Sequence, residues 1–207
     1  NKKIIILTSL SIQESFKNEI FNSDKENNKI DLNEFTCTSS DYLNEWNEFI
    51  NNNSNNDATL IKNFKDEIVG EYFEIYGYQK FVNTYKKQIF DEKEKKYNIN
   101  KINELFSNRV FIIDEIHNLR STINSEDEDE DNKDIKEDKK NKKDDENNNK
   151  EIKILIENII KNLNEPTKLV LLSATPMYDL YTEFEYIINL LLLNDKREKL
   201  SQKIIDN

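Results

Sequence analysis

The chain has 207 residues and a formal net charge of −11, with 41 acidic and 30 basic side chains. This length suits one domain with a sizeable core. The single cysteine, Cys37, excludes an internal disulfide framework and fits a reducing, intracellular compartment. The longest apolar stretch, residues 187–193 with Asn189 inside it, is too short to span a bilayer, and no signal peptide is recognisable. No basic stripe can be read, so charge gives no independent support for nucleic-acid binding.

The first predicted element is a buried strand over Ile4–Leu7, a continuous apolar run followed by Thr8 and Ser9. A helix should follow to about residue 21, because Ser11 and Glu14 have the spacing of a capping box. Its inner face carries Ile12, Phe16 and Ile20. Hydroxyl groups beside a helix N-terminus suit a phosphate group, but Thr8 and Ser9 account equally well for a simple capped turn.

The next predicted elements carry no recognisable motif of their own. We expect a short strand over 30–35, a helix from about 39–41 with Trp46 and Phe49 inside, and an Asn-rich loop over 51–57. Residues 71–76 read as a strand because they are aromatic and β-branched. A helix from about Gly77 or Gln79 should bury Phe81, Val82, Tyr85 and Ile89. Residues 92–101 are then expected to be a charged helix end.

The most informative segment is Val110–Ile113, four apolar residues without alternation, followed at once by Asp114 and Glu115. Such a run predicts a central parallel strand, and ligands of open α/β sheets bind beyond the carboxyl ends of the strands. Two adjacent carboxylates are costly to bury unless a cation relieves them, and Mg²⁺ usually takes one or two carboxylates plus substrate phosphates. The pattern therefore favours a nucleotide site, in which Asp114 holds Mg²⁺ and Glu115 activates the attacking water. The alternative is a strand that ends in two solvated acids.

Beyond Arg120 the composition changes abruptly. Residues 125–149 contain one apolar residue, Ile135, and cannot bury enough surface to offset their ordering entropy, so we expect a disordered insertion there. A helix over 152–163 and a buried strand over 168–172 follow, and a closing helix is expected over 183–193. The second strand ends in Ser173, Ala174 and Thr175, whose hydroxyls would reach His117 or the two acids if the strands are neighbours. His117 is the only histidine in the chain.

Asp114-Glu115-Ile116-His117 resembles the DExH form of the Walker B motif of superfamily 2 helicases and translocases, and Ser173-Ala174-Thr175 resembles their motif III. The sequence around both motifs more closely resembles that of the helicase-like ATPases of large DNA viruses, which are related to the poxvirus early transcription factor small subunit and nucleoside triphosphate phosphohydrolase I. The resemblance implies an α/β fold: a RecA-like P-loop NTPase core, mostly parallel, with helices on both faces of the sheet. Residues 1–124 and 150–207 would be two parts of the first RecA-like domain, separated by the insertion over 125–149.

The resemblance also implies roles for the residues. Asp114, Glu115 and His117 would be catalytic, with Asp114 on Mg²⁺. Ser173, Ala174 and Thr175 would couple hydrolysis to movement, and Thr8 and Ser9, in the place of motif Ia, would touch a nucleic-acid backbone. ATP and Mg²⁺ would be the cofactors, and nucleic acid, with DNA favoured over RNA, would be the partner. An RNA polymerase or transcription complex is a further expected partner, in a virion or in the host cytoplasm or nucleus if the protein is viral.

One departure from the family is plain, since no Gly-x-x-x-x-Gly-Lys-Ser/Thr occurs in the chain. The phosphate-cradling loop would precede Asn1, and the second RecA-like domain would follow Asn207. Three functions remain open: an ATP-dependent helicase or translocase, a transcription-factor ATPase that does not unwind, and a non-catalytic α/β interaction module. A phosphate-binding loop elsewhere in the parent protein would eliminate the third.

Overall fold

The computed structural model describes residues 2–21, 40–53, 58–119, 136–176 and 181–200, with the backbone alone described over 40–44, at 118, and over 136–148 and 181–183. The strands are β1 Ile4–Leu7, β2 Phe73–Tyr76, β3 Phe90–Asp91, β4 Lys96–Tyr97, β5 Val110–Ile113 and β6 Lys168–Leu171. The helices are α1 Gln13–Ile20, α2 Ser40–Asn52, α3 Ala58–Tyr72, α4 Tyr78–Ile89, α5 Ile99–Phe106, the 3₁₀ turn η1 Ile116–Leu119, α6 Lys136–Asn162 and α7 Tyr181–Asn194. None of the described helices is long and apolar enough to cross a membrane.

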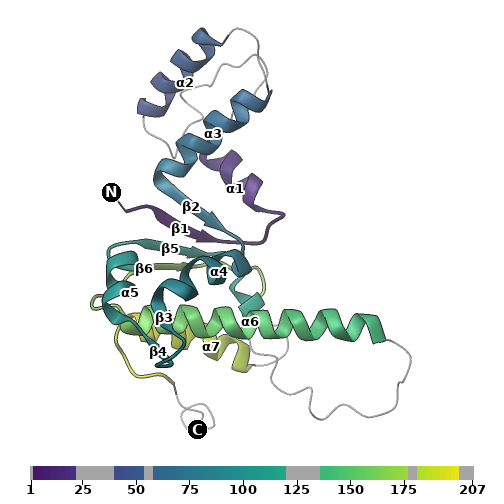
Figure 1. Cartoon of the computed structure of the whole chain (residues 1–207), viewed down its shortest axis with the longest axis vertical. Helices are drawn as coiled ribbons and strands as arrows, with labels where there is room; N and C mark the ends of the chain where they lie inside the picture. The colour runs from purple at the N-terminus through teal and green to yellow at the C-terminus, as the bar shows by residue number, and fades with distance from the viewer. Residues whose placement is uncertain (1, 22–39, 54–57, 120–135, 177–180, 201–207) are drawn as a thin grey trace.

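A four-stranded, all-parallel sheet in the order β2-β1-β5-β6 forms the centre of the molecule (Figure 1). The protein is therefore an α/β protein with a parallel sheet flanked by helices, as the sequence predicts. β1 and β5 occupy the two central positions, and this explains their unbroken apolar runs. Because all four strands run in one direction, their carboxyl ends lie at the same edge of the sheet.

Two apolar cores hold helices against this sheet. The larger core joins one sheet face to α4, α5, α6 and α7, and it includes Leu7, Phe81, Phe111 and Ile156. The smaller core joins α1, α2 and α3 to β2 around Trp46, which is fully buried. Figure 1 shows the first group of helices gathered around β5 and β6, and the second group beyond β2.

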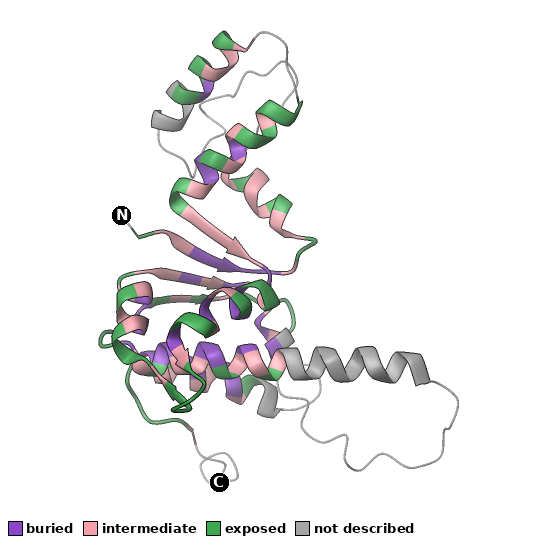
Figure 2. Cartoon of the chain, in the orientation of Figure 1, coloured by how far each residue is buried: buried purple, intermediate pink, exposed green. Residues whose placement is uncertain are grey.

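The covering of the second sheet face is incomplete over the described residues. Ile6 of β1 is 2% exposed. On β6, by contrast, Val170, which pairs with Ile112 of β5, is 42% exposed, and Leu172 just after the strand is 39% exposed. In Figure 2, β6 carries exposed segments in green, whereas β1 is pink and purple. The helices on both faces that the sequence predicts are thus present over β1 and β2, whereas part of the β6 surface is open.

Several local predictions differ from the structure. Helix α1 begins with Ile12 as its N-cap and has no side-chain cap, because the Ser11 hydroxyl lies 3.0 Å from the Ser9 hydroxyl; the capping-box prediction is wrong. Residues 71–72 end helix α3, so the strand begins at Phe73. Helix α7 begins at residue 181 rather than 183. The strand expected over 30–35 lies outside the described residues.

The charged segment after α4 is a β-hairpin, β3–β4, and not the predicted helix end. Phe90 and Tyr97 pair across the two strands with ring centroids 4.9 Å apart. The Asp91 carboxylate accepts hydrogen bonds from the backbone N–H groups of residues 93 and 94, and Lys95 takes a positive φ of 52°. Aromatic pairing and an aspartate-stabilised turn therefore override the helical propensity of the lysines and glutamates.

Helix α6 begins at Lys136, sixteen residues before the predicted start at Ile152. The prediction of disorder is therefore wrong for residues 136–149, and residues 125–135 lie outside the described part of the chain. The physical reason is that this segment continues directly into the apolar half of α6, so it extends a helix that is already formed, and its five lysines have high helix propensity. The apolar half is buried as predicted, with Ile152, Leu155, Ile156, Ile159, Ile160 and Leu163 inside.

Candidate functional site

The carboxyl edge of the sheet brings together the ends of β1, β5 and β6. The backbone N–H of Asp114 donates to Leu7 O at 2.9 Å, and that of Leu172 donates to Ile113 O at 2.9 Å, so the ladder extends one residue beyond the strands. Ile116 N in turn donates to Leu172 O at 3.0 Å. The sequence-predicted residues Thr8, Asp114, Glu115, His117 and Ser173 therefore belong to one region, although Thr8 and Ser173 are far apart in sequence.

Thr8 is part of the acidic site. It is fully buried, and its hydroxyl donates a 2.8 Å hydrogen bond to Asp114 Oδ2. Thr8 is fully buried in this conformation, and its contact with a nucleic-acid backbone stays a prediction. The hydrogen bond fixes the Asp114 carboxylate at the end of β1 and leaves its other oxygen out of that interaction. Ser9 is half-buried and shares a 3.0 Å hydrogen bond with the exposed Ser11, so its contact with nucleic acid stays a prediction.

The chain turns sharply after β5, and Glu115 takes a φ of 52°. A residue with a side chain in this left-handed region costs about 1–3 kcal/mol and needs support from its surroundings. The support comes from Tyr78 at the first residue of α4, whose hydroxyl donates to the carbonyl of Asp114 and lies 3.4 Å from that of Glu115. Burial raises the pKa of the Tyr78 hydroxyl well above its usual range, and the neighbouring Asp114 and Glu115 raise it further, so the phenol keeps its proton and donates.

His117 connects the two strand ends through one ring nitrogen. Its Nδ1 lies 2.9 Å from Ser173 Oγ and 3.0 Å from Glu115 Oε2. The hydrogen-bond geometry is met by Ser173, and Glu115 Oε2 is buried with no hydrogen-bond partner among the described residues. A carboxylate oxygen this close favours the tautomer with hydrogen on Nδ1, since two lone pairs would repel. One ring N–H therefore lies between two acceptors.

The residues that resemble motif III are arranged around Ser173. Its hydroxyl oxygen, which contacts His117, also accepts the backbone N–H of Thr175 at 3.2 Å. Ser173 is half-buried, whereas Ala174 and Thr175 are exposed. The contact between Ser173 and His117 that the sequence led us to expect is thus present. Thr175 joins the network through its backbone.

Tyr78 is the residue at this site that sequence reasoning missed. The sequence offered a corner between a strand and a helix that contains two tyrosines, Tyr76 and Tyr78, and nothing distinguished their hydroxyls. The structure separates them: the Tyr76 hydroxyl joins Tyr85 and Glu74, and the Tyr78 hydroxyl joins the Asp114–Glu115 turn. Periodicity does not predict the Tyr78 contact, because its partner, Asp114, lies 36 residues away in sequence.

The donor set fits a magnesium ion that is held together with a phosphate ligand better than one held by protein alone. Among the described residues, no group of three or more His, Cys, Asp or Glu side chains is arranged to bind a metal. Mg²⁺ commonly needs only one or two carboxylates when phosphates and water complete its coordination. Glu115 Oε2 is buried, and the one N–H near it, on His117 Nδ1 at 3.0 Å, is shared with Ser173, so a bound water molecule would complete the hydrogen bonding of this oxygen.

No family model matches this chain, and neither the curated proteins nor the solved structures that were searched contain a match.

Proposed function

We propose that this chain is part of the first RecA-like domain of an ATP-dependent nucleic-acid helicase or translocase, and that Asp114, Glu115 and His117 form its hydrolytic site. The observation that supports this most strongly is the single nitrogen of His117 between Glu115 and Ser173. If Glu115 were only a solvated acid at the end of β5, no histidine would be needed to connect it to the end of β6. A motor that couples hydrolysis to movement needs such a link.

In this proposal the two acids have different tasks because their surroundings differ. Asp114 has one carboxylate oxygen fixed by the Thr8 hydroxyl, and its carboxylate would hold a Mg²⁺ ion bound together with ATP. Glu115 has a buried oxygen that shares the single N–H of His117 with Ser173, so it keeps acceptor capacity for a water molecule, from which it would take a proton. ATP and Mg²⁺ supply the phosphoryl group and the charge that stabilises its transfer. The phosphate-binding loop is expected from another segment of the parent protein.

A second function on the same site is an ATPase that remodels a protein complex without unwinding nucleic acid. The net charge of −11 favours it, because a nucleic-acid track usually shows a basic surface. The two functions share the hydrolytic chemistry. Measuring strand separation and ATP hydrolysis on the same protein distinguishes them.

The test uses the parent protein and the substitutions Glu115→Gln and His117→Ala. Glu115→Gln keeps shape but cannot take a proton, so single-turnover hydrolysis should fall by roughly 10²–10⁴-fold while ATP affinity changes little. His117→Ala should reduce stimulation by nucleic acid more than basal hydrolysis. The matched control is Glu71→Gln on the exposed end of α3, which should change neither. Wild-type hydrolysis by Glu115→Gln refutes the proposal.

A further inference from the structure

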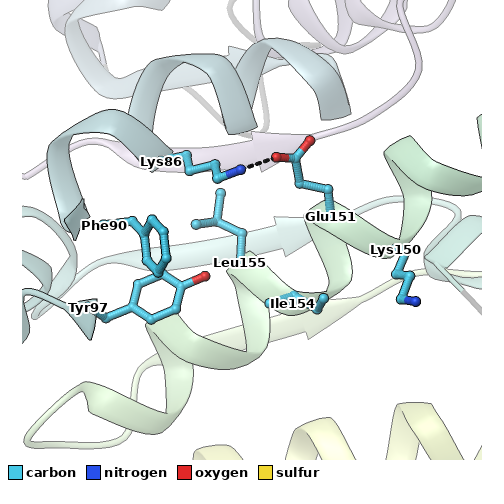
Figure 3. Close-up of a pocket in the computed structure, with 7 residues that line it drawn as sticks. All are labelled: Lys86, Phe90, Tyr97, Lys150, Glu151, Ile154 and Leu155. Carbon is cyan, nitrogen blue, oxygen red and sulfur yellow. Dashed lines mark hydrogen bonds and ion pairs between the residues drawn. The ribbon is translucent and has the colours of Figure 1, made fainter. Parts of the chain in front are cut away.

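A hollow of about 420 Å³ lies between the end of α4, the β3–β4 hairpin and α6 (Figure 3). Helix α4 has twelve residues, so about 18 Å separate this end from Tyr78 and the acidic site. A second hollow of about 290 Å³ adjoins the first through Lys86 and Phe90 and adds Lys87 and Glu92. The lining residues of the larger hollow are Lys86, Phe90, Tyr97, Lys150, Glu151, Ile154 and Leu155.

One side of the hollow is apolar. The rings of Phe90 and Tyr97 form one wall, with an interplanar angle of 58°, and the buried Leu155 lies beside them (Figure 3). Ile154 stands at the edge and is 46% exposed, off the buried face of α6. The hairpin has only two paired residues in each strand, so the hydrogen-bond ladder alone stabilises it little. An exposed isoleucine opposite two aromatic rings is a suitable place for a large apolar side chain from outside.

The rim of the hollow carries positive charge and one hydroxyl. Lys86 pairs with Glu151 above the rings, and Lys150 is exposed with no hydrogen bond or ion pair among the described residues. The Tyr97 hydroxyl points into the hollow in Figure 3 and has no hydrogen-bond partner in the described part of the chain. Together the two hollows hold three lysines, at 86, 87 and 150, and two glutamates, at 92 and 151. The lining therefore has a net charge of +1, with Lys86 paired to Glu151, in a chain of net charge −11.

We propose that this hollow docks a short acidic segment of a partner protein, with one large apolar side chain between the two rings and Ile154 and flanking carboxylates beside Lys150 and Lys87. Charge complementarity selects the acidic flanks, and the apolar wall selects the central side chain. A nucleotide fits less well, because the tilted rings of Phe90 and Tyr97 offer no parallel slot for a flat base. The inference does not depend on the proposed ATPase.

The test is fluorescence anisotropy with a fluorescein-labelled, capped peptide that has tryptophan at its centre and two acidic residues on each side. It should bind the protein saturably. Ile154→Ser should weaken binding by about tenfold through lost apolar burial. Lys150→Glu should weaken it by about fivefold through charge reversal. Both side chains are exposed, so both variants should fold as the wild type does.

Two matched controls separate the hollow from general surface effects. Leu60→Ser changes a side chain that is 45% exposed on α3, close to the 46% of Ile154, and Lys80→Glu makes the same charge reversal at an exposed position on α4 that does not line the hollow. Each should leave affinity within about twofold of wild type. Three results overturn the proposal. The first is no saturable binding below about 1 mM, and the second is equal binding of the peptide with serine in place of tryptophan. The third is displacement of the labelled peptide by AMP or a single-stranded oligonucleotide but not by the unlabelled peptide.

Discussion

Removing one oxygen atom from Tyr78 should destabilise the protein and loosen the turn that carries the candidate site. The Tyr78 hydroxyl donates to the carbonyl of Asp114, and the next residue, Glu115, has a φ of 52°. In Tyr78→Phe the ring stays, but the carbonyl loses its donor at a half-buried position. Leaving such a group unsatisfied costs about 1–3 kcal/mol. We expect the free energy of unfolding to fall by that amount.

The same substitution at Tyr186 is the matched control. Tyr186 on α7 is 7% exposed, and its hydroxyl is buried without a hydrogen-bond partner among the described residues. Tyr186→Phe removes an unsatisfied polar group, so it should be neutral or stabilising. Urea unfolding followed by the fluorescence of Trp46, the only tryptophan, measures both variants. Equal effects of the two substitutions, or a neutral Tyr78→Phe, would show that the Tyr78 hydroxyl does not support the turn.

Two further predictions concern polar contacts outside the site. Burial raises the pKa of Glu74, but hydrogen bonds from Arg109 and Tyr85 outweigh burial and hold that pKa below its usual value. The stability that this carboxylate adds is therefore complete above the usual pKa of glutamate. It is lost as the pH falls through the lowered pKa of the folded state. Arg109→Met should therefore cost about 2–3 kcal/mol near pH 7 and clearly less near pH 3, by urea unfolding at both pH values. The Lys196 ammonium donates to three carbonyls at the end of α6, and Lys196→Met should cost about 1–2 kcal/mol by the same measurement. Lys101→Met, which breaks only an exposed pair 2.8 Å long, should cost under about 1 kcal/mol, and a loss as large as that of the other two would contradict the assignments.

The elements that the sequence predicted well are those whose pattern has a single physical cause. Val110–Ile113 was predicted and observed with the same bounds, because only a strand covered on both faces needs four consecutive apolar residues. Helix α4 buries Phe81, Val82, Tyr85 and Ile89, as its period requires. The contact between Ser173 and His117 was expected for a similar reason, since neighbouring parallel strands place their carboxyl ends side by side.

The features that the sequence did not reveal depend on contacts between distant segments. Residues 58–72 form α3, although the polar residues of this segment hide its short buried face of Lys65, Ile68 and Val69. The turn between Phe90 and Tyr97 looked like helix because lysine and glutamate favour helices, and only the pairing of the two rings decides otherwise. The hydrogen bond from Thr8 to Asp114 was not predicted, because the two residues are 106 positions apart in sequence.

The arrangement around His117 has a consequence for how the two strands communicate. Nδ1 carries at most one proton, and two acceptors, Glu115 Oε2 at 3.0 Å and Ser173 Oγ at 2.9 Å, lie within its reach. When Glu115 is the stronger acceptor, the ring N–H donates to the Glu115 carboxylate, and Ser173 Oγ loses this donor. When Glu115 takes a proton from water in the proposed reaction, its demand falls and the N–H returns to Ser173, whose oxygen also holds the backbone N–H of Thr175 at 3.2 Å. A change in the protonation of Glu115, at the end of β5, would thereby alter the hydrogen bonding of Ser173 and the backbone N–H of Thr175, after β6.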